Sequence, residues 1–264
     1  MLSDFKGYGS PQTRRGMASP YGPPPWHMSG RVLTVWFRVK NLDELRNHIA
    51  PPLTIPKDAL CRARFWDLTH DAGKGHDLPG QIPAQTHFHE AVLAIDADYG
   101  DMPGDYSVHI FADDPTYIAW AREVIGWPVK MGQVAFNQPW NPTNLKPNDR
   151  LTGTLERFGT QLLRASVTLK RPIHPDERPY KRANWFTYKI IPSVEKLAPE
   201  VSQLVLVQPS TLDSGQLWEA DGTVEIGQGL NDELHFLQPA EIVWAEYWSY
   251  VNLSVGYGKI LAQL

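Results

Sequence analysis

The sequence predicts a mainly β domain of the α+β kind, in which the strands form a closed, barrel-like antiparallel sheet with a few peripheral helices. Short segments of alternating apolar and polar residues recur along most of the chain, separated by turns rich in Gly, Pro, Asn and Asp. Few stretches have helical periodicity. Many short strands with few helices are typical of closed β-sheets. There is no internal repeat and no second break in hydrophobicity, so we expect one domain.

Composition narrows the function classes. The chain has 264 residues, of which 20% are charged and 42% hydrophobic, as in an ordinary soluble globular protein with a sizeable core. A formal net charge of −4 provides no basic patch, so we expect no nucleic-acid partner. Cys61 is the only cysteine, which excludes an internal disulfide and fits a reducing compartment. With no long apolar run and no secretory signal, we expect a cytoplasmic protein that does not enter a membrane.

The elements can be assigned in order along the chain. Residues 1–20 are rich in Gly, Pro and Ser, so we expect a flexible segment before a single domain over 21–264. Asn41 can cap a short helix that ends before Pro51, and the polar residues 69–85 predict a loop. Strands are expected at 31–39, 60–68, 87–97, 106–112, 134–136, 151–158, 162–170, 185–190, 201–209, 216–226 and 240–253.

A second helix should lead directly to the most informative stretch of the chain. Asp114 can cap this helix and Pro115 suits its first turn, while Gly126 is a natural left-handed stop. Pro128 prevents a return to helix, so the chain becomes extended and places Lys130 among apolar neighbours. Burial lowers the pKa of a lysine because it disfavours the charged form. The resulting neutral amine can attack carbonyl groups.

The residues of this stretch carry a family resemblance. Ala121-Arg-Glu-Val-Ile-Gly-Trp-Pro-Val-Lys-Met-Gly132 resembles the lysine segment of the acetoacetate decarboxylase superfamily, usually Arg-Glu-x-x-x-aromatic-Pro-Lys-Lys-x-Gly. Asn184-Trp-Phe-Thr-Tyr-Lys-Ile-Ile-Pro192 resembles a second family segment, and Gly153-Thr-Leu a third. The resemblance extends from Tyr21 to about Ile226. It implies an acetoacetate decarboxylase-like barrel or cone that assembles as a homo-oligomer.

The resemblance also implies a reaction class. In the family the first lysine of the pair forms a Schiff base with the substrate, and the second lowers its pKa. Here Val129 occupies the first position and only Lys130 keeps an amine. We therefore expect a lyase that acts on a small-molecule oxo acid other than acetoacetate, by decarboxylation, aldol or dehydration chemistry. Lys130 would be either the Schiff-base amine or a fixed cation that stabilises an enolate.

Further site residues follow from the same resemblance. Glu90 falls where the family keeps a pocket glutamate, so it would be the general acid and base. A second family glutamate is replaced by Trp66, which implies a roomier, more aromatic pocket. Arg31 would hold the substrate carboxylate through a bidentate pair. The remaining substrate-binding residues are expected to be Trp127, Val129 and Met131.

The direction of Lys130 is left open by the sequence. Neighbours in an extended segment point to opposite sides, so the amine of Lys130 should face away from the side of Val129. A bulge in the strand could turn it back. Two further functions therefore stay open: a non-covalent cyclase or isomerase that uses Glu90 as base, and a binding protein that has lost catalysis.

A competing constellation is His87-Phe-His89, because histidines two apart on a strand share one face and can bind one metal ion. His109 on the next strand could be the third ligand, and Glu90 would lie on the opposite face. Clustered histidines are common without a metal, so we expect no metal site and no cofactor. Other metal-ligating side chains nearby in the sequence are Asp67, His70, Asp71, His76 and Asp77.

Overall fold

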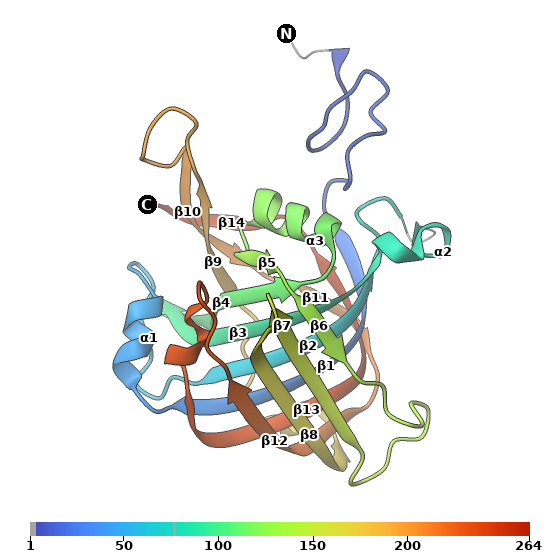
Figure 1. Ribbon diagram of the computed structural model, residues 1–264, viewed down its shortest axis with the longest axis vertical. Coiled ribbons are helices and arrows are strands. Elements are labelled where there is room, and N and C mark those ends of the chain that lie inside the picture. The colour runs from blue at the N-terminus through green and yellow to red at the C-terminus, as the bar shows by residue number, and fades with distance from the viewer. Residues whose placement is uncertain (1–3, 76–77) are drawn as a thin grey trace.

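The computed structural model describes residues 4–75 and 78–264, most of which belong to one strongly curled sheet (Figure 1). Its strands follow the order β14-β10-β9-β4-β3-β2-β1-β13-β12-β8-β7-β6, with β5 beside β4 and β11 beside β13. The strands are β1 (Trp26–Val39), β2 (Cys61–His70), β3 (His87–Tyr99), β4 (Met102–Ala112), β5 (Val129–Met131), β6 (Gln133–Phe136), β7 (Arg150–Arg157), β8 (Thr160–Ile173), β9 (Trp185–Ile191), β10 (Val201–Val207), β11 (Ser210–Ser214), β12 (Leu217–Ile226), β13 (Pro239–Val255) and β14 (Lys259–Gln263). The helical segments are α1 (Leu42–His48), α2 (Leu78–Gln81), η2 (Pro83–Gln85), α3 (Pro115–Trp120), the π-helical η3 (Ala121–Ile125), η4 (Pro175–Glu177) and η5 (Glu233–Phe236).

The mainly β fold predicted from the sequence is confirmed, with two differences in detail. Strands β5 and β9 run parallel to β4, so the sheet is mixed rather than antiparallel throughout. The helical connection between β4 and β5 explains the first parallel pair, because such a crossover brings the chain back to the end where the earlier strand began. The path of paired strands runs from β14 to β6 without joining, so the described strands form a barrel-like curl that is not closed.

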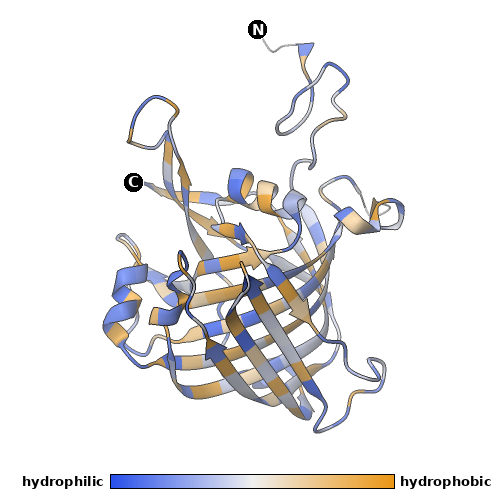
Figure 2. Ribbon diagram, in the orientation of Figure 1, coloured by the Kyte–Doolittle hydropathy of each residue, from blue (hydrophilic) through white to orange (hydrophobic). Residues whose placement is uncertain are grey.

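The two largest hydrophobic clusters of the described residues lie on the two faces of this sheet, because successive side chains of a strand point to opposite sides. Leu33, Phe65 and Leu93 belong to the inner core, which fills the curl. Trp66 and Val92 point the other way and join an outer core that includes α3. Along several strands in Figure 2, hydrophobic and hydrophilic residues alternate. Neighbouring residues of β2 and β3 therefore contribute to different environments.

The segment around α3 follows the sequence closely. The Asp114 side chain accepts a hydrogen bond from the backbone N–H of Tyr117, and Pro115 occupies the first turn, as predicted. The helix then widens into the π turn η3, which the sequence did not predict. It ends at Gly126, whose φ of 93° is left-handed. A Cβ at this glycine would lie 2.4 Å from the Cβ of Lys189, so the position has room only for glycine.

Several boundaries and segments differ from the expectations. Strand β1 begins before residue 31, and β11 and β14 were not predicted. The expected loop at 69–85 contains α2 and η2, while its His76 and Asp77 lie outside the described residues. An N-terminal arm projects from the sheet (Figure 1), and its Tyr21 is buried against Trp26.

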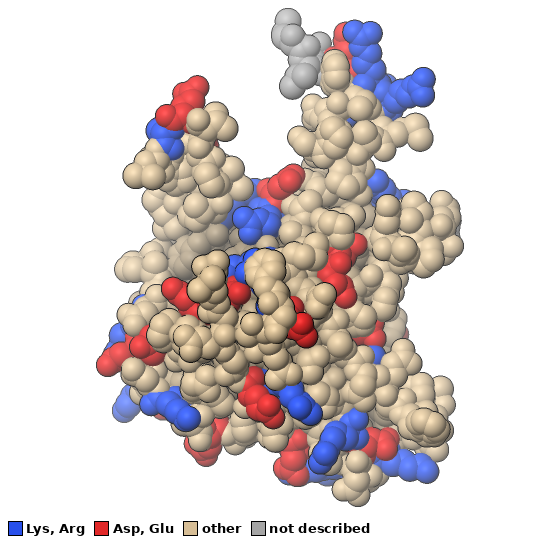
Figure 3. All heavy atoms as spheres, viewed as in Figure 1, with Lys and Arg blue, Asp and Glu red and all other residues tan. Residues whose placement is uncertain are grey.

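The described residues include no helix that is both long and apolar enough to cross a membrane. On the face seen in Figure 3, acidic and basic side chains are intermixed.

The packing of β7 against β2 provides a test of the inner core. A Cβ at Gly153 would lie 2.1 Å from Cγ of Phe65, a buried ring that cannot move without disturbing its neighbours. We expect Gly153→Ala to lower the free energy of unfolding by at least the roughly 1–3 kcal/mol typical of an overpacked core, as measured by urea denaturation. Gly80→Ala is the control, because a Cβ there meets nothing within 4 Å. Equal stabilities of the two variants would contradict this packing.

Candidate functional site

A cavity opens on the outer face of β2, β3 and β4, next to α3. It has a volume of about 40 Å³, enough for a few water molecules, and its walls are mostly apolar. Glu90 lies inside it, paired across the strands with Trp66. The residues that line the cavity are Met28, Arg64, Trp66, Leu68, Glu90, Val92, Ser107, Ile110, Tyr117, Trp127, Trp185, Leu253 and Val255.

Glu90 is a buried carboxyl group in the lining of this cavity. Its side chain is buried, and the Tyr117 hydroxyl donates a 2.6 Å hydrogen bond to its Oε1 atom. Burial raises the pKa of Glu90 to about 7, while the Tyr117 hydrogen bond and the positive charge of Arg64 act in the opposite direction. A carboxyl group with a pKa near neutrality can both release and accept a proton at physiological pH.

A larger vestibule of about 370 Å³ adjoins the cavity and shares four lining residues with it, namely Arg64, Trp66, Trp185 and Leu253. The vestibule carries Arg178 and Arg182 as further guanidinium groups. Arg178 donates two hydrogen bonds to Glu246, at 2.9 and 2.6 Å, so its charge is already paired.

Arg64 is the cation at the junction of the cavity and the vestibule. Its carboxylate partner Asp105 lies 3.2 Å away and also forms a 2.9 Å ion pair with Arg62. Asp105 is therefore shared between two guanidinium groups and balances only part of the charge of Arg64.

Lys130 lies on the other side of the sheet from Glu90. Its strand β5 pairs with β4 in regular register, with Val129 opposite Ile110 and Lys130 opposite Phe111. Val129 is fully buried in the outer core, on the face that carries the cavity, but it does not line the cavity as the sequence predicted. The amine of Lys130 is 2.7 Å from Asp232 Oδ1 and 5.6 Å from the centre of the Phe111 ring, on the inner side. The strand contains no bulge between these pairs, so Lys130 keeps the direction that an extended chain gives it.

Of the other residues that the sequence predicted for the site, some line the cavity and some do not. Trp66 and Trp127 line the cavity with Glu90, as expected. Arg31 does not, because its Nε and Nη2 atoms donate hydrogen bonds to Asp67 at 2.8 and 2.7 Å on the inner face. The register of β1 against β2 is regular here, with Arg31 opposite Asp67, so Arg31 shares the inner face with Leu33 two residues on. Met131 is half exposed on β5 and does not line the cavity.

The sequence did not identify Arg64, Tyr117 and Trp185 as cavity residues. A signal existed for Arg64, because it stands two residues before Trp66 on the same strand and therefore points to the same face. Tyr117 reaches Glu90 from α3, and Trp185 comes from the distant strand β9, so both contacts depend on tertiary structure.

The buried carboxyl of Glu90 should make stability depend on pH. Between about pH 4.5 and 7 the folded chain keeps a proton on Glu90 that the unfolded chain releases, so the free energy of unfolding falls as pH rises through this window. Glu90→Gln removes the effect and should be more stable than wild type at pH 8, by up to about 3 kcal/mol. At pH 4.5 the difference should be small. Urea denaturation at the two pH values measures this, with exposed Glu156→Gln as the control.

Chemical trapping can show which face of β5 carries a reactive amine. We expect no reduced adduct on Lys130 when the protein is treated with pyruvate and borohydride, because its amine is paired with Asp232 on the inner side. Val129→Lys would place an amine in the buried outer core, where burial lowers its pKa, and should yield an adduct at position 129. Mass spectrometry locates the adduct, and circular dichroism checks that the variant is folded. An adduct on Lys130 of the wild type would contradict the assigned direction.

Comparisons with known proteins agree with this architecture. Residues 9–264 match the profile of a family described as acetoacetate decarboxylase. An acetoacetate decarboxylase from Burkholderia mallei is 26% identical over 247 residues, which cover 92% of this chain and 90% of that protein.

Two solved structures share the fold. An acetoacetate decarboxylase-like enzyme from Sphingomonas wittichii superposes with a TM-score of 0.88 at 22% identity, covering 98% of this chain and 100% of that one. The enduracididine biosynthesis enzyme MppR complexed with pyruvate gives a TM-score of 0.85 at 22% identity, covering 97% and 98% of the two chains. Because the family profile matches residues 9–264 of this chain, the chain belongs to the acetoacetate decarboxylase family.

Proposed function

We propose that this protein is a lyase that acts on a small oxo acid, and that Glu90 moves the proton without a Schiff base on Lys130. The observation that carries the proposal is Glu90 itself, a buried carboxyl with a pKa raised to about 7 in an apolar cavity. Lys130 is held by Asp232 on the opposite face. The structural similarity to MppR, which was solved with pyruvate, supports an oxo acid as substrate.

In the proposed reaction the substrate enters through the vestibule and its carboxylate binds Arg64. The bond that breaks joins the carbon adjacent to the carbonyl to the departing group, which leaves as CO₂ in a decarboxylation or as an aldehyde in an aldol cleavage. The electron pair of that bond remains on the adjacent carbon as an enolate. Protonated Glu90 then donates its proton to that carbon, and in the reverse direction it removes the same proton. The positive charge of Arg64 stabilises the enolate inside a site with apolar walls.

Tyr117 has a positioning role in this scheme. Its hydroxyl holds Oε1 of Glu90, which leaves Oε2 for the substrate proton. The same hydrogen bond lowers the pKa of Glu90 against the effect of burial. Tyr117→Phe removes it without removing the ring, so the pH dependence of activity should move to higher pH.

A cyclase or isomerase is the second candidate, favoured by Val129. With valine at position 129, the described lining of the cavity contains no amine, and the lysine of the adjoining vestibule is Lys181. Proton transfer by Glu90 alone is sufficient for these reactions. The experiment below detects the proton step common to both candidates, and product analysis separates cleavage from isomerisation.

Proton exchange in D₂O tests the role of Glu90. The protein is incubated with pyruvate, 2-oxobutyrate and aromatic 2-oxo acids, and NMR follows deuterium entry at the carbon next to the carbonyl. We expect catalysed exchange with at least one acid, and a loss of about 10²–10⁴-fold in Glu90→Gln, as is typical for a general acid–base group. Glu156→Gln, an exposed strand glutamate, should keep the wild-type rate.

Two results would overturn the proposal. One is exchange that survives unchanged in Glu90→Gln. The other is a borohydride-reduced adduct on a lysine of the wild type, which would show covalent catalysis.

A further inference from the structure

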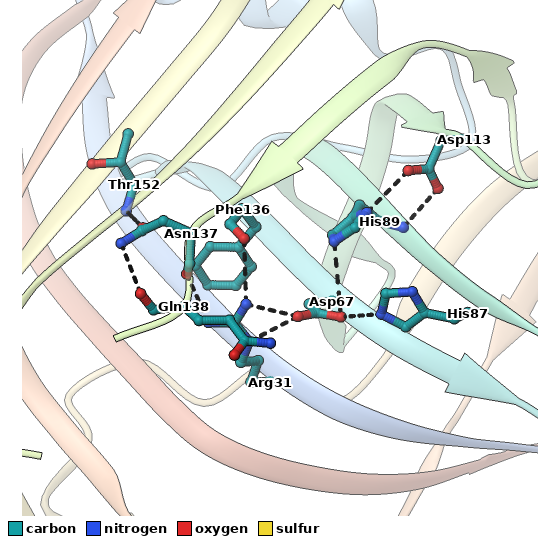
Figure 4. Close-up of polar contacts among 9 residues, drawn as sticks. All are labelled: Arg31, Asp67, His87, His89, Asp113, Phe136, Asn137, Gln138 and Thr152. Atoms are coloured by element: carbon teal, nitrogen blue, oxygen red, sulfur yellow. Dashed lines mark hydrogen bonds and ion pairs between the residues drawn. The ribbon is translucent and has the colours of Figure 1, made fainter. Parts of the chain in front are cut away.

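We propose that Asp67, His87 and His89 form a binding site for a divalent transition metal ion, with Zn²⁺ as the expected occupant. The three side chains lie on the inner face of β2 and β3 (Figure 4), where their ligand atoms are all within 4.8 Å of one another. The site is separate from the Glu90 cavity, because the cross-strand pair Asp67–His89 directly follows the pair Trp66–Glu90 and points to the other face.

The distances fit a small ion after modest side-chain adjustment. Nε2 of His87 is 2.6 Å from Oδ1 of Asp67, and Nε2 of His89 is 3.9 Å from the same oxygen. Ligand atoms about 2.0–2.2 Å from a tetrahedral zinc ion are roughly 3.3–3.5 Å apart, which lies between these two values. An ion between the two side chains takes the Nε2 lone pair of His87, so this histidine binds it as the tautomer with its hydrogen on Nδ1.

His89 is already oriented as a metal ligand. Its Nδ1 atom is 3.0 Å from Oδ2 of Asp113, and its backbone N–H donates a 2.7 Å hydrogen bond to Oδ1 of the same residue. A carboxylate at Nδ1 holds the proton there and leaves the lone pair of Nε2 directed toward Asp67. This carboxylate–histidine arrangement is the usual support of a histidine that binds a metal ion.

Asp67 is oriented from the other side by Arg31. Both hydrogen bonds from Arg31 go to Oδ2, at 2.8 and 2.7 Å, so Oδ1 remains directed toward the histidines. Arg31 is itself held by the carbonyl oxygen of Asn137 at 2.7 Å and lies over the Phe136 ring at 4.4 Å (Figure 4). The arginine reduces the negative charge at the site and therefore favours ions that bind imidazole strongly over Ca²⁺ or Mg²⁺.

The site is open to solvent and provides three protein ligands, which leaves the fourth position of a tetrahedral ion for water. The His87 side chain is 49% exposed and that of His89 is 24% exposed, so an ion can enter from solvent. The sequence suggested His109 as third ligand, but that residue contacts His48, with ring centres 5.7 Å apart. Asp67 takes its place because the register of β2 against β3 sets it opposite His89.

Zinc titration of the untagged, EDTA-stripped protein tests the proposal. Isothermal titration with ZnCl₂ should give one ion per chain, and His87→Ala and His89→Ala should each weaken binding at least tenfold. Asp113→Asn should weaken it about 10–100-fold, the usual effect of losing a supporting carboxylate. The control is His174→Ala, an exposed histidine at η4. Absence of zinc binding by the wild type, or equal binding by all the variants, would overturn the site.

A second measurement uses only the wild-type protein and so does not depend on whether the variants fold. Diethyl pyrocarbonate labelling of histidines, read by mass spectrometry, should decrease at His87 and His89 when ZnCl₂ is added and stay constant at His174. Labelling of His87 and His89 that is unaffected by saturating zinc would also overturn the proposal. Catalysis of proton exchange by Glu90 is a separate property of the other face, so its failure would leave this result unchanged.

Discussion

The alternation of side chains along β2 and β3 is the constraint on which the rest of the molecule depends. One cross-strand pair, Trp66 with Glu90, belongs to an apolar cavity, and the next pair, Asp67 with His89, belongs to a polar cluster on the other face. Residues adjacent in sequence can lie in two unlike environments, because successive side chains of a strand point to opposite faces of the sheet. A one-residue change of register would exchange the two sets of side chains.

The buried carboxyl of Glu90 is unfavourable for folding whenever it is ionised, and the surrounding structure reduces that cost. Tyr117 donates a hydrogen bond to it and Arg64 contributes positive charge, yet burial remains the largest effect on its pKa. Such a group is rarely kept in a core for stability alone, which is why a raised pKa in a cavity indicates function. The cost in stability and the acid–base property have the same physical origin.

Local features of this fold could be predicted from the sequence, and long-range ones could not. The capping by Asp114 and the stop at Gly126 depend on a few adjacent residues, and both are present. The spacing of Glu90 from the family segment predicted a pocket position, and Glu90 lines a cavity. The opposite direction of Lys130 followed from strand geometry, but only the structure could exclude a bulge.

Tyr117 and Trp185 were missed for the same reason. Each reaches the cavity from an element distant in sequence from β3, Tyr117 from α3 and Trp185 from β9. The pairing of Asp67 with His89 depends on the register between two strands, which residue preferences do not determine. The parallel position of β9 beside β4 likewise joins segments that are distant in sequence.

The close approach of Gly126 to Lys189 has a consequence for how this site could be altered. That contact fixes the end of η3, and the pairing of Val129 with Ile110 fixes the start of β5. Only Trp127 and Pro128 lie between the two fixed points, so the chain has no slack through which β5 could rotate. Side-chain substitutions around the strand therefore cannot bring the amine of Lys130 to the cavity. Removing one residue from this linker could, because the length of the chain, and not the chemistry of its side chains, determines which face the lysine occupies.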